Sequence, residues 1–215
     1  MDEISYLLKS HYREKFLSFG ATTKGVDWGD DEYRANSRNY KMLEITKYLK
    51  SFNQKEASVL DVGCGYGALL EIIQRENINV TYSGIDLVPE MIGYARKRYP
   101  ATAFFEGDIL EFNKKKFDFV VSNGILTQKM MASQREMDKY ANKLIKKMFN
   151  LSNLGIVFNL MTTHVNFQNE RLYYRNPSEM LAWCMSELSP CVKLDAAYDP
   201  WFEYSVFVFK EHVSQ

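Results

Sequence analysis

The chain has 215 residues, and its 27 lysines and arginines balance its 27 aspartates and glutamates, so its formal net charge is zero. This balance argues against bulk electrostatic binding of nucleic acid or of an anionic membrane surface. Hydrophobic residues make up 46% and charged residues 25%, a composition that excludes disordered and fibrous chains. We therefore expect a single compact domain over residues 1–215.

The N-terminal residues and the cysteines bear on the cell compartment. The first residues, MDEISYLLKSHYREKF, lack the basic start and the apolar run of a secretory signal, and no stretch has the apolar length of a membrane span. The cysteines, Cys64, Cys184 and Cys191, are odd in number and lack the paired spacing of a zinc site or a disulfide framework. These features predict a cytoplasmic protein without a metal site.

Residues 1–57 precede the first predicted strand. They contain a loop-like stretch, GATTKGVDWGDDE, and then a helical one, NYKMLEITKYLKSF. We expect this segment to form a helical cap over a Rossmann-like core at residues 58–215.

From residue 58 onward, short β-branched or aromatic runs alternate with amphipathic stretches. This pattern is typical of an α/β fold with helices on both faces of a parallel sheet. The first five predicted strands are residues 58–62, 80–86, 101–105, 117–122 and 154–161. Two final runs, 192–198 and 204–210, are separated only by DPWFE, which is too short for a crossover helix, so they should pair antiparallel. The sequence predicts a mostly parallel, seven-stranded sheet with an antiparallel last strand.

The segment VLDVGCGYGALLEII joins an apolar strand to a helix through Gly63, Gly65 and Gly67. Open α/β sheets bind ligands at the carboxyl ends of their strands. A bare turn there lets a ligand approach the backbone N–H groups. The alternative is a turn with only a packing role.

Acidic residues end the next two predicted strands, Asp86 in SGIDLVPEM and Asp108 in GDIL. An acid roughly twenty residues after such glycines can accept hydrogen bonds from ribose hydroxyls. Two acids on the edge that carries the glycine turn therefore predict a nucleoside site.

The same turn also fits a dinucleotide fingerprint through Gly63, Gly65 and Ala68. Asp61 lies two residues before the first glycine. An unpaired carboxylate there would repel a pyrophosphate and would favour a ligand that carries a sulfonium and an ammonium.

These motifs together resemble the class I S-adenosylmethionine-dependent methyltransferases. The resemblance rests on the D-x-G-x-G-x-G turn, on Asp86, on the Gly107–Asp108 pair and on the FDFVVSNG strand. It implies that the turn holds the methionine moiety, Asp86 the ribose, Leu87 one adenine face, and Asp108 with Ile109 the adenine amino edge. It further implies that the backbone carbonyl of Asn123 accepts from the cofactor's amino group.

The full set of residues expected to bind the cofactor includes two from the cap. An aromatic ring near a sulfonium gains cation–π attraction, and an arginine can pair with the cofactor's carboxylate. The set is Asp61, Gly63, Cys64, Gly65, Gly67, Asp86, Leu87, Asp108, Ile109, Asn123, Trp28 and Arg38. Tyr33 is a further cap candidate, and Arg38 is alternatively a surface charge.

The acceptor site should lie over the ends of the fourth and fifth strands, at NGILTQK and TTHVNFQNERLYY. His164 is the candidate catalytic base, because it directly follows the fifth strand. Its alternative is a loop histidine bonded to backbone. Arg171, Tyr173 and Tyr174 are candidates for acceptor binding, or else a packed aromatic pair beside a solvated arginine.

The other basic residues are expected to be solvated, namely His11, His212 and the lysines at 114–116. The chain has SNGI where a DNA amino-methyltransferase would have an N-P-P-Y-like turn, which argues against base flipping.

The fragment FGATTKGVDWG resembles methyltransferases that modify bacterial sugars and polysaccharides. We therefore expect methyl transfer to a small-molecule acceptor, first a hydroxyl of a sugar or sugar-linked metabolite. One alternative is methyl transfer to another small molecule, a protein or an RNA. The other is a non-catalytic nucleoside-binding module.

Overall fold

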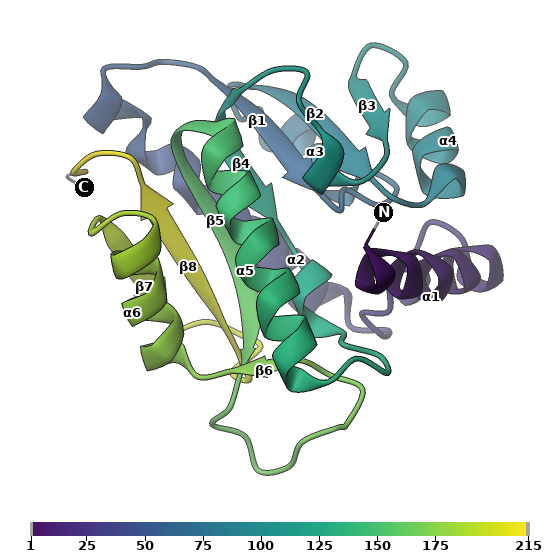
Figure 1. Ribbon diagram of the computed structural model, residues 1–215. Coiled ribbons are helices and arrows are strands. Elements are labelled where there is room, and N and C mark those ends of the chain that lie inside the picture. The colour runs from purple at the N-terminus through teal and green to yellow at the C-terminus, as the bar shows by residue number, and fades with distance from the viewer. Residues whose placement is uncertain (1, 214–215) are drawn as a thin grey trace.

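The computed structural model describes residues 2–213 as an α/β fold in which one sheet separates two layers of helices (Figure 1). The strand order is β3-β2-β1-β4-β5-β8-β7. These strands are β1 (Ala57–Val62), β2 (Val80–Asp86), β3 (Ala103–Glu106), β4 (Phe117–Ser122), β5 (Ser152–Thr162), β7 (Val192–Asp195) and β8 (Glu203–Phe209). β8 runs antiparallel to β5 and β7, and the other pairs on this path are parallel. The predicted sheet with its reversed last strand is confirmed.

The sheet also has an eighth strand, β6 (Tyr174–Arg175), which pairs parallel with the end of β5. Two residues are too few to show a strand's alternation, so no sequence pattern signals it. β7 ends at Asp195, short of the predicted residue 198. The Asp195 carboxylate accepts a hydrogen bond from the Ala197 N–H at 2.9 Å, and this local turn takes the chain out of the ladder.

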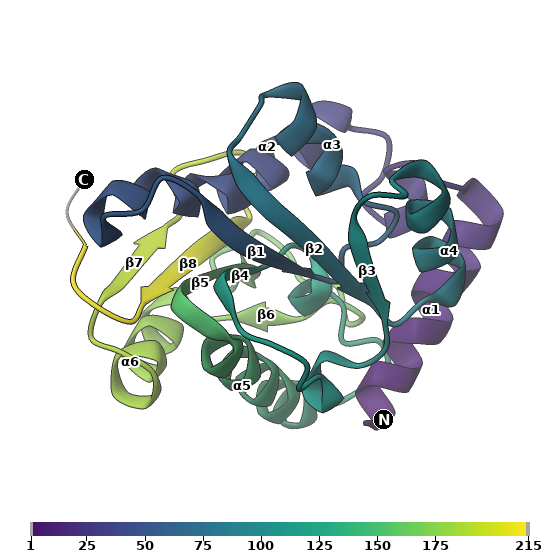
Figure 2. The ribbon, with the colours of Figure 1, turned by 90° about the horizontal axis from the view of Figure 1, so that it is seen from above.

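Helices cover both faces of the sheet (Figure 2). One face carries α5 (Gln134–Leu151) and α6 (Pro177–Glu187), and the other carries α2 (Glu32–Leu43), η2 (Glu44–Phe52), α3 (Ala68–Arg75) and α4 (Pro89–Arg98). A capping box between Ser133 and Glu136 begins α5. The sequence did not predict α6, since only Met180 and Cys184 of this helix are buried and its apolar pattern is weak.

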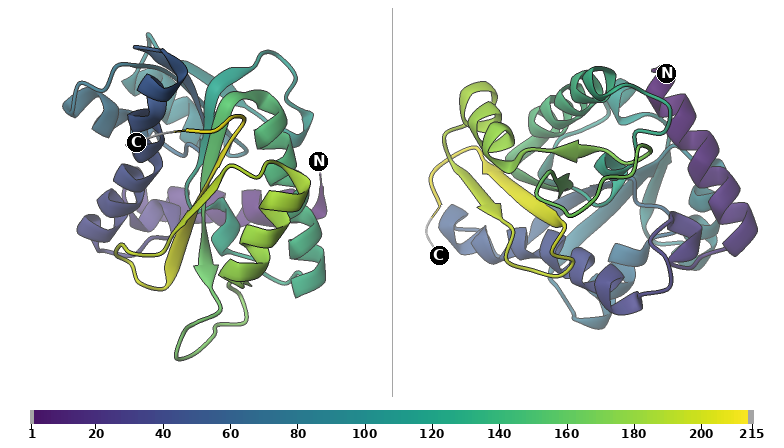
Figure 3. Two further views of the ribbon diagram at one scale, coloured as in Figure 1. Left: turned by 90° about the vertical axis from the view of Figure 1, so that its left-hand side faces the viewer. Right: turned by 90° about the horizontal axis from the view of Figure 1, so that it is seen from below.

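The N-terminal segment is divided between two places. α1 (Glu3–Phe19), capped by the Asp2 side chain, and η1 (Lys24–Val26) lie at the edge where β1 and β2 end (Figure 3). η2 instead packs on a sheet face, where Ile45 and Leu49 join the core with Val59. Two short helices, η3 (Ile109–Glu111) and η4 (Ile125–Thr127), follow β3 and β4. Among residues 2–213 no helix combines the length and the apolar character needed to cross a membrane.

Candidate functional site

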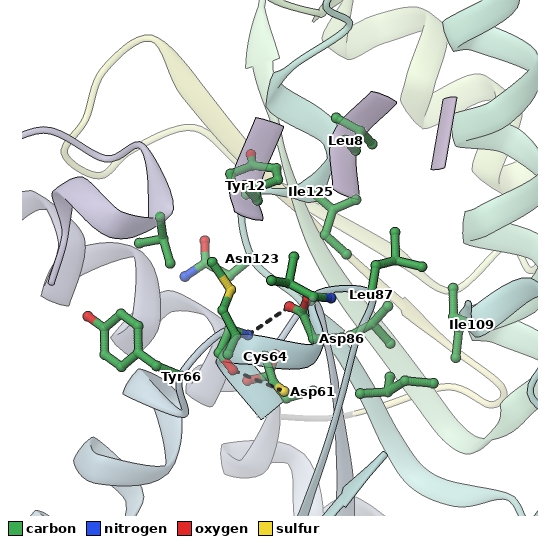
Figure 4. A pocket seen from close by; sticks show the side chains of 18 of the residues that line it. Leu8, Tyr12, Asp61, Cys64, Tyr66, Asp86, Leu87, Ile109, Asn123 and Ile125 are labelled. Atoms are coloured by element: carbon green, nitrogen blue, oxygen red, sulfur yellow. Dashed lines mark hydrogen bonds between the residues drawn. The ribbon is translucent and has the colours of Figure 1, made fainter. Parts of the chain in front are cut away.

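A pocket opens at the carboxyl ends of β1, β2 and β4 and is covered by α1 (Figure 4). The sheet order reverses between β1 and β4, the position at which open α/β sheets bind ligands. The pocket holds about 940 Å³ of empty space, its open mouth included. Leu8 and Tyr12 of α1 face Asp61 and Cys64 across it (Figure 4). A mostly apolar pocket with a few polar groups is typical of small-molecule sites.

The glycine turn after β1 forms the floor of the pocket. Gly63 has φ +74°, and a Cβ there would lie 2.5 Å from side-chain carbons of Ile125, so only glycine fits. The N–H groups of Gly63 and Cys64 donate to the Ile85 carbonyl at 2.8 and 3.2 Å, which fixes the turn to β2. The Gly65 N–H donates to Asp86. The expectation that a ligand approaches the N–H groups of this turn is therefore wrong for Gly63, Cys64 and Gly65, whose N–H groups are bonded within the protein.

Asp86 lies at the end of β2 and lines the pocket. Its two carboxylate oxygens accept from the N–H groups of Gly65 at 2.9 Å and Val88 at 2.8 Å. Burial raises the pKa of Asp86, against the lowering effect of these backbone donors. Each oxygen keeps a lone pair for a further donor, such as a ribose hydroxyl.

Asp61 is 3% exposed and also lines the pocket. The expectation that its carboxylate is unpaired is wrong, because the Tyr82 hydroxyl donates to it at 2.8 Å. Burial raises the pKa of Asp61 to about 7, in spite of this hydrogen bond. A cation that enters the pocket beside Asp61 would favour its charged form and lower that pKa.

Asp108 and Ile109 also line the pocket, and Ile109 lies on the side of Leu87 away from Cys64 (Figure 4). One Asp108 oxygen accepts from the Leu110 N–H at 2.9 Å and so caps η3. Tyr140 and Leu144 of α5 line the pocket as well. No motif in the sequence assigns these two residues to the site, because a helical stretch does not show which part of the fold it reaches.

Asn123, directly after β4, lines the pocket and is 9% exposed. Its Nδ2 donates to Oδ1 of Asn39 at 2.8 Å. Its Oδ1 is buried and has no hydrogen-bond partner among residues 2–213. A buried unpaired acceptor is costly, so it marks a place where a ligand donor fits.

Three other predicted residues have different surroundings from those expected. Trp28 lines the pocket, but Arg38 does not, because its guanidinium is bound to Glu203 with Nη2 2.6 Å from Oε1. At 8% exposed, Arg38 is not a surface charge either. Gly67 faces the Tyr99 ring rather than the pocket, and Tyr33 is 72% exposed.

The acceptor candidates after β5 lie outside the pocket. His164 is exposed, and none of the residues that line the pocket comes from the segment between β5 and β6, which projects from the body of the molecule (Figure 1). Tyr173 and Tyr174 are buried, whereas Arg171 is exposed. The packed aromatic pair beside a solvated arginine is therefore the interpretation that agrees with the structure.

His11 was expected to be solvated, and this is wrong. Its side chain is 9% exposed, and its Nε2 lies 2.8 Å from Oδ2 of Asp27. Asp27 also binds Lys15 at 2.7 Å and accepts from Gln128 at 3.0 Å. Burial would raise the pKa of Asp27, but the hydrogen bonds with His11 and Lys15 outweigh it and hold that pKa below its usual value. The pairing joins residues distant in sequence, so no local pattern signals it. His212 and the lysines at 114–116 are exposed as predicted.

Comparison with known proteins agrees with this geometry. Residues 53–204 match the family described as a methyltransferase domain. A protein of Mycobacterium tuberculosis named as a methyltransferase is 28% identical over 155 residues, which cover 71% of this chain and 93% of that protein. The dTDP-3-amino-3,4,6-trideoxy-α-D-glucopyranose N,N-dimethyltransferase of Streptomyces venezuelae is 35% identical over 80 residues, which cover 37% of this chain and 33% of that enzyme.

Among solved structures, the magnesium protoporphyrin IX methyltransferase of Synechocystis with bound S-adenosylmethionine is similar. It has a TM-score of 0.66 and 12% identity, with 100% of this chain and 99% of that one covered. The family match spans more than half of the chain, and the fold is the one that the glycine turn and the strand-end acids implied. The chain therefore belongs to the class I, S-adenosylmethionine-dependent methyltransferases.

Proposed function

We propose that this enzyme transfers the methyl group of S-adenosylmethionine to a hydroxyl of a sugar or sugar-linked small molecule. The relatives support a sugar-linked acceptor: the Streptomyces venezuelae enzyme named above acts on a dTDP-linked amino sugar. An amino pentose methyltransferase from Micromonospora echinaspora, involved in calicheamicin biosynthesis, is also similar in structure, with a TM-score of 0.55 and 16% identity. The resemblance of FGATTKGVDWG to sugar-modifying enzymes adds to this support.

The polar wall of the pocket supports S-adenosylmethionine as the cofactor, because its side chains are hydrogen-bond acceptors and two of them are carboxylates. It is lined by Asp61, Asp86 and Asn123, and the buried Oδ1 of Asn123 has no hydrogen-bond partner among residues 2–213. These groups accept hydrogen bonds and attract cations, so they suit an ammonium and ribose hydroxyls better than a pyrophosphate. In the proposed site, Asp61 and Asn123 bind the amino group, Asp86 the ribose, and Asp108 with Ile109 and Leu87 the adenine.

Methyl transfer breaks the S–CH₃ bond as the acceptor oxygen forms a new O–CH₃ bond, and S-adenosylhomocysteine leaves. The acceptor's proton must go to a base. The sequence nominates His164, which is exposed and separate from the pocket lining. We favour His11, which does not itself line the pocket but adjoins the pocket-lining Tyr12, with ring centroids 5.1 Å apart, and is oriented by Asp27. Gln128, from the loop after β4, holds the same aspartate.

The experiment measures S-adenosylhomocysteine formation with a panel of sugar and nucleotide-linked sugar acceptors. For the best acceptor, His11→Ala should lower turnover by roughly 10²–10⁴-fold with cofactor affinity nearly unchanged. His164→Ala is the matched control and should turn over at nearly the wild-type rate. The reverse result would return the role to His164.

Two other results would change the proposed acceptor. If both variants retain wild-type turnover, the transfer needs no histidine base, which favours an amine or carboxylate acceptor. If the wild-type protein binds S-adenosylhomocysteine but methylates no member of the panel, the sugar-linked acceptor is wrong.

A further inference from the structure

We propose that Asn159 and Glu203, with Arg38 behind them, are positioning residues that hold the Asn123–Gly124 turn against the cofactor. None of the three lines the pocket. They form a chain of hydrogen bonds that runs from helix α2, through β8 and β5, to the turn after β4. The inference rests on the cofactor site proposed above and adds residues that act through the turn.

The contacts run in one direction from Arg38 to the turn. Arg38 donates to Glu203 through Nη2 at 2.6 Å and through Nε at 2.9 Å to Oε1 and 3.1 Å to Oε2. Nδ2 of Asn159 donates to Oε2 of Glu203 at 2.9 Å. Oδ1 of Asn159 then accepts from the Gly124 N–H at 2.8 Å. Every link therefore fixes the orientation of the next.

Burial makes this arrangement unusual for a purely structural contact. Arg38, Asn159 and Glu203 are 8%, 1% and 2% exposed. A buried ion pair gains little or nothing in stability over apolar residues of similar size, because both charges lose their hydration. A role in holding a particular geometry accounts for the pair better than stability does.

The turn at the end of this chain has a demanding shape. Gly124 has φ +88°, and a Cβ there would lie 2.9 Å from Nε1 of Trp28. The Arg38 guanidinium lies over the Trp28 ring, with Cζ of Arg38 5.5 Å from the ring centroid. The side-chain amide nitrogen of Asn123 donates to Asn39, and its buried Oδ1 has no partner among residues 2–213. The cap and the network together thus set where the Asn123 carbonyl groups lie.

The test exchanges the acid and the amide. In Glu203→Gln, one carboxylate oxygen becomes an NH₂ group, which is a donor. It must face either the Arg38 donors or the Asn159 donor, so one of these hydrogen bonds is lost. In the double variant Glu203→Gln/Asn159→Asp, the glutamine oxygen accepts from Arg38 and its nitrogen donates to the carboxylate that replaces the Asn159 amide. That carboxylate still accepts from Gly124. The second change should therefore repair the first.

The readout is S-adenosylhomocysteine affinity by calorimetry, well below each variant's melting temperature. Glu203→Gln should bind about tenfold more weakly, as expected for a misplaced hydrogen-bonding turn. The double variant should return to within about twofold of wild type. Ser205→Ala is the matched control, because Ser205 is a fully buried polar residue of β8 that bonds Tyr198 and not the turn. It should bind as wild type does.

Should Glu203→Gln fail to fold, Asn159→Leu replaces it, since it removes the contact with Gly124 and leaves the ion pair whole. The same tenfold loss is expected. A folded Glu203→Gln or Asn159→Leu protein with wild-type affinity would overturn the positioning role, as would a folded double variant no better than Glu203→Gln. A wild-type protein that does not bind S-adenosylhomocysteine would instead overturn the proposed cofactor site.

Discussion

The two walls of the pocket are built in different ways. The sheet wall is held by carboxylates that accept from main-chain N–H groups, as Asp86 does from Gly65 and Val88. The α1 wall is held by contacts between side chains, among them Arg13 with Glu90 at 2.6 Å and Lys15 with Asp27 at 2.7 Å. Partly exposed ion pairs contribute little free energy each. We therefore expect the sheet wall to be fixed and the α1 wall to open and close over the ligand.

The largest effect should follow from removing the anchor of the sheet wall. Asp86→Ala loses the proposed ribose contacts, which as charge-assisted hydrogen bonds are worth about 1.5–3 kcal/mol each, and it frees the Gly65 N–H. S-adenosylhomocysteine affinity by calorimetry should fall at least tenfold and up to about a hundredfold. Glu106→Ala is the control, because Glu106 pairs with Asp86 in register but is exposed. Equal affinities of the two folded variants would place the ribose elsewhere.

A substitution of Asp61 tests whether the buried carboxylate of the sheet wall lowers the free energy of unfolding. A carboxyl whose pKa is raised to about 7 by burial destabilises the fold increasingly as pH rises from about 4 to 7. Asp61→Asn should therefore raise the unfolding free energy of the ligand-free protein at pH 8, on the order of 2–4 kcal/mol, and little at pH 4. Denaturant titrations at both pH values measure this. Unchanged stability at pH 8 would mean that burial of this charge carries no penalty.

The same group should make ligand binding depend on pH. An ammonium beside Asp61 lowers its pKa, so binding releases a proton below pH 7. S-adenosylhomocysteine affinity should rise by up to about tenfold per pH unit toward pH 7 and then level off. In Asp61→Asn that dependence should disappear. A wild-type affinity that is flat between pH 5.5 and 8 would show that the amino group does not contact Asp61.

The smallest effect is expected on the α1 wall. Asp27→Asn weakens the contacts with His11 and Lys15, so hydrogen exchange within Glu3–Phe19 should accelerate about fivefold, as for a loss of about 1 kcal/mol. Because the pKa of Asp27 is lowered in the fold, the wild-type contact should also be lost as the pH falls well below 4. Asp30→Asn, on the same loop but 77% exposed, is the control. Exchange that is equally slow in both variants would mean that apolar packing alone holds α1.

Much of the sheet wall could be predicted from the sequence. The strand runs ending in Asp86 and Asp108 and the glycines at 63–67 are local signals, and the rule that parallel strands end at one edge brings them together. The α1 wall could not be predicted in the same way. The sequence predicts a helical cap over residues 1–57, but it does not show where each helix docks. The contributions of Leu8 and Tyr12 to the pocket follow from that docking.

The sequence by itself determined the sheet, its reversed last strand and the chemistry of the strand ends, because apolar periodicity and turn residues act over a few positions. Only the tertiary structure decided which distant partners the buried polar side chains take. Arg38 binds Glu203, 165 residues further along the chain, and Asn123 binds Asn39 across 84. A buried polar group must find a partner wherever packing places one. The partner therefore depends on contacts between distant segments, and the spacing of residues along the chain does not predict it.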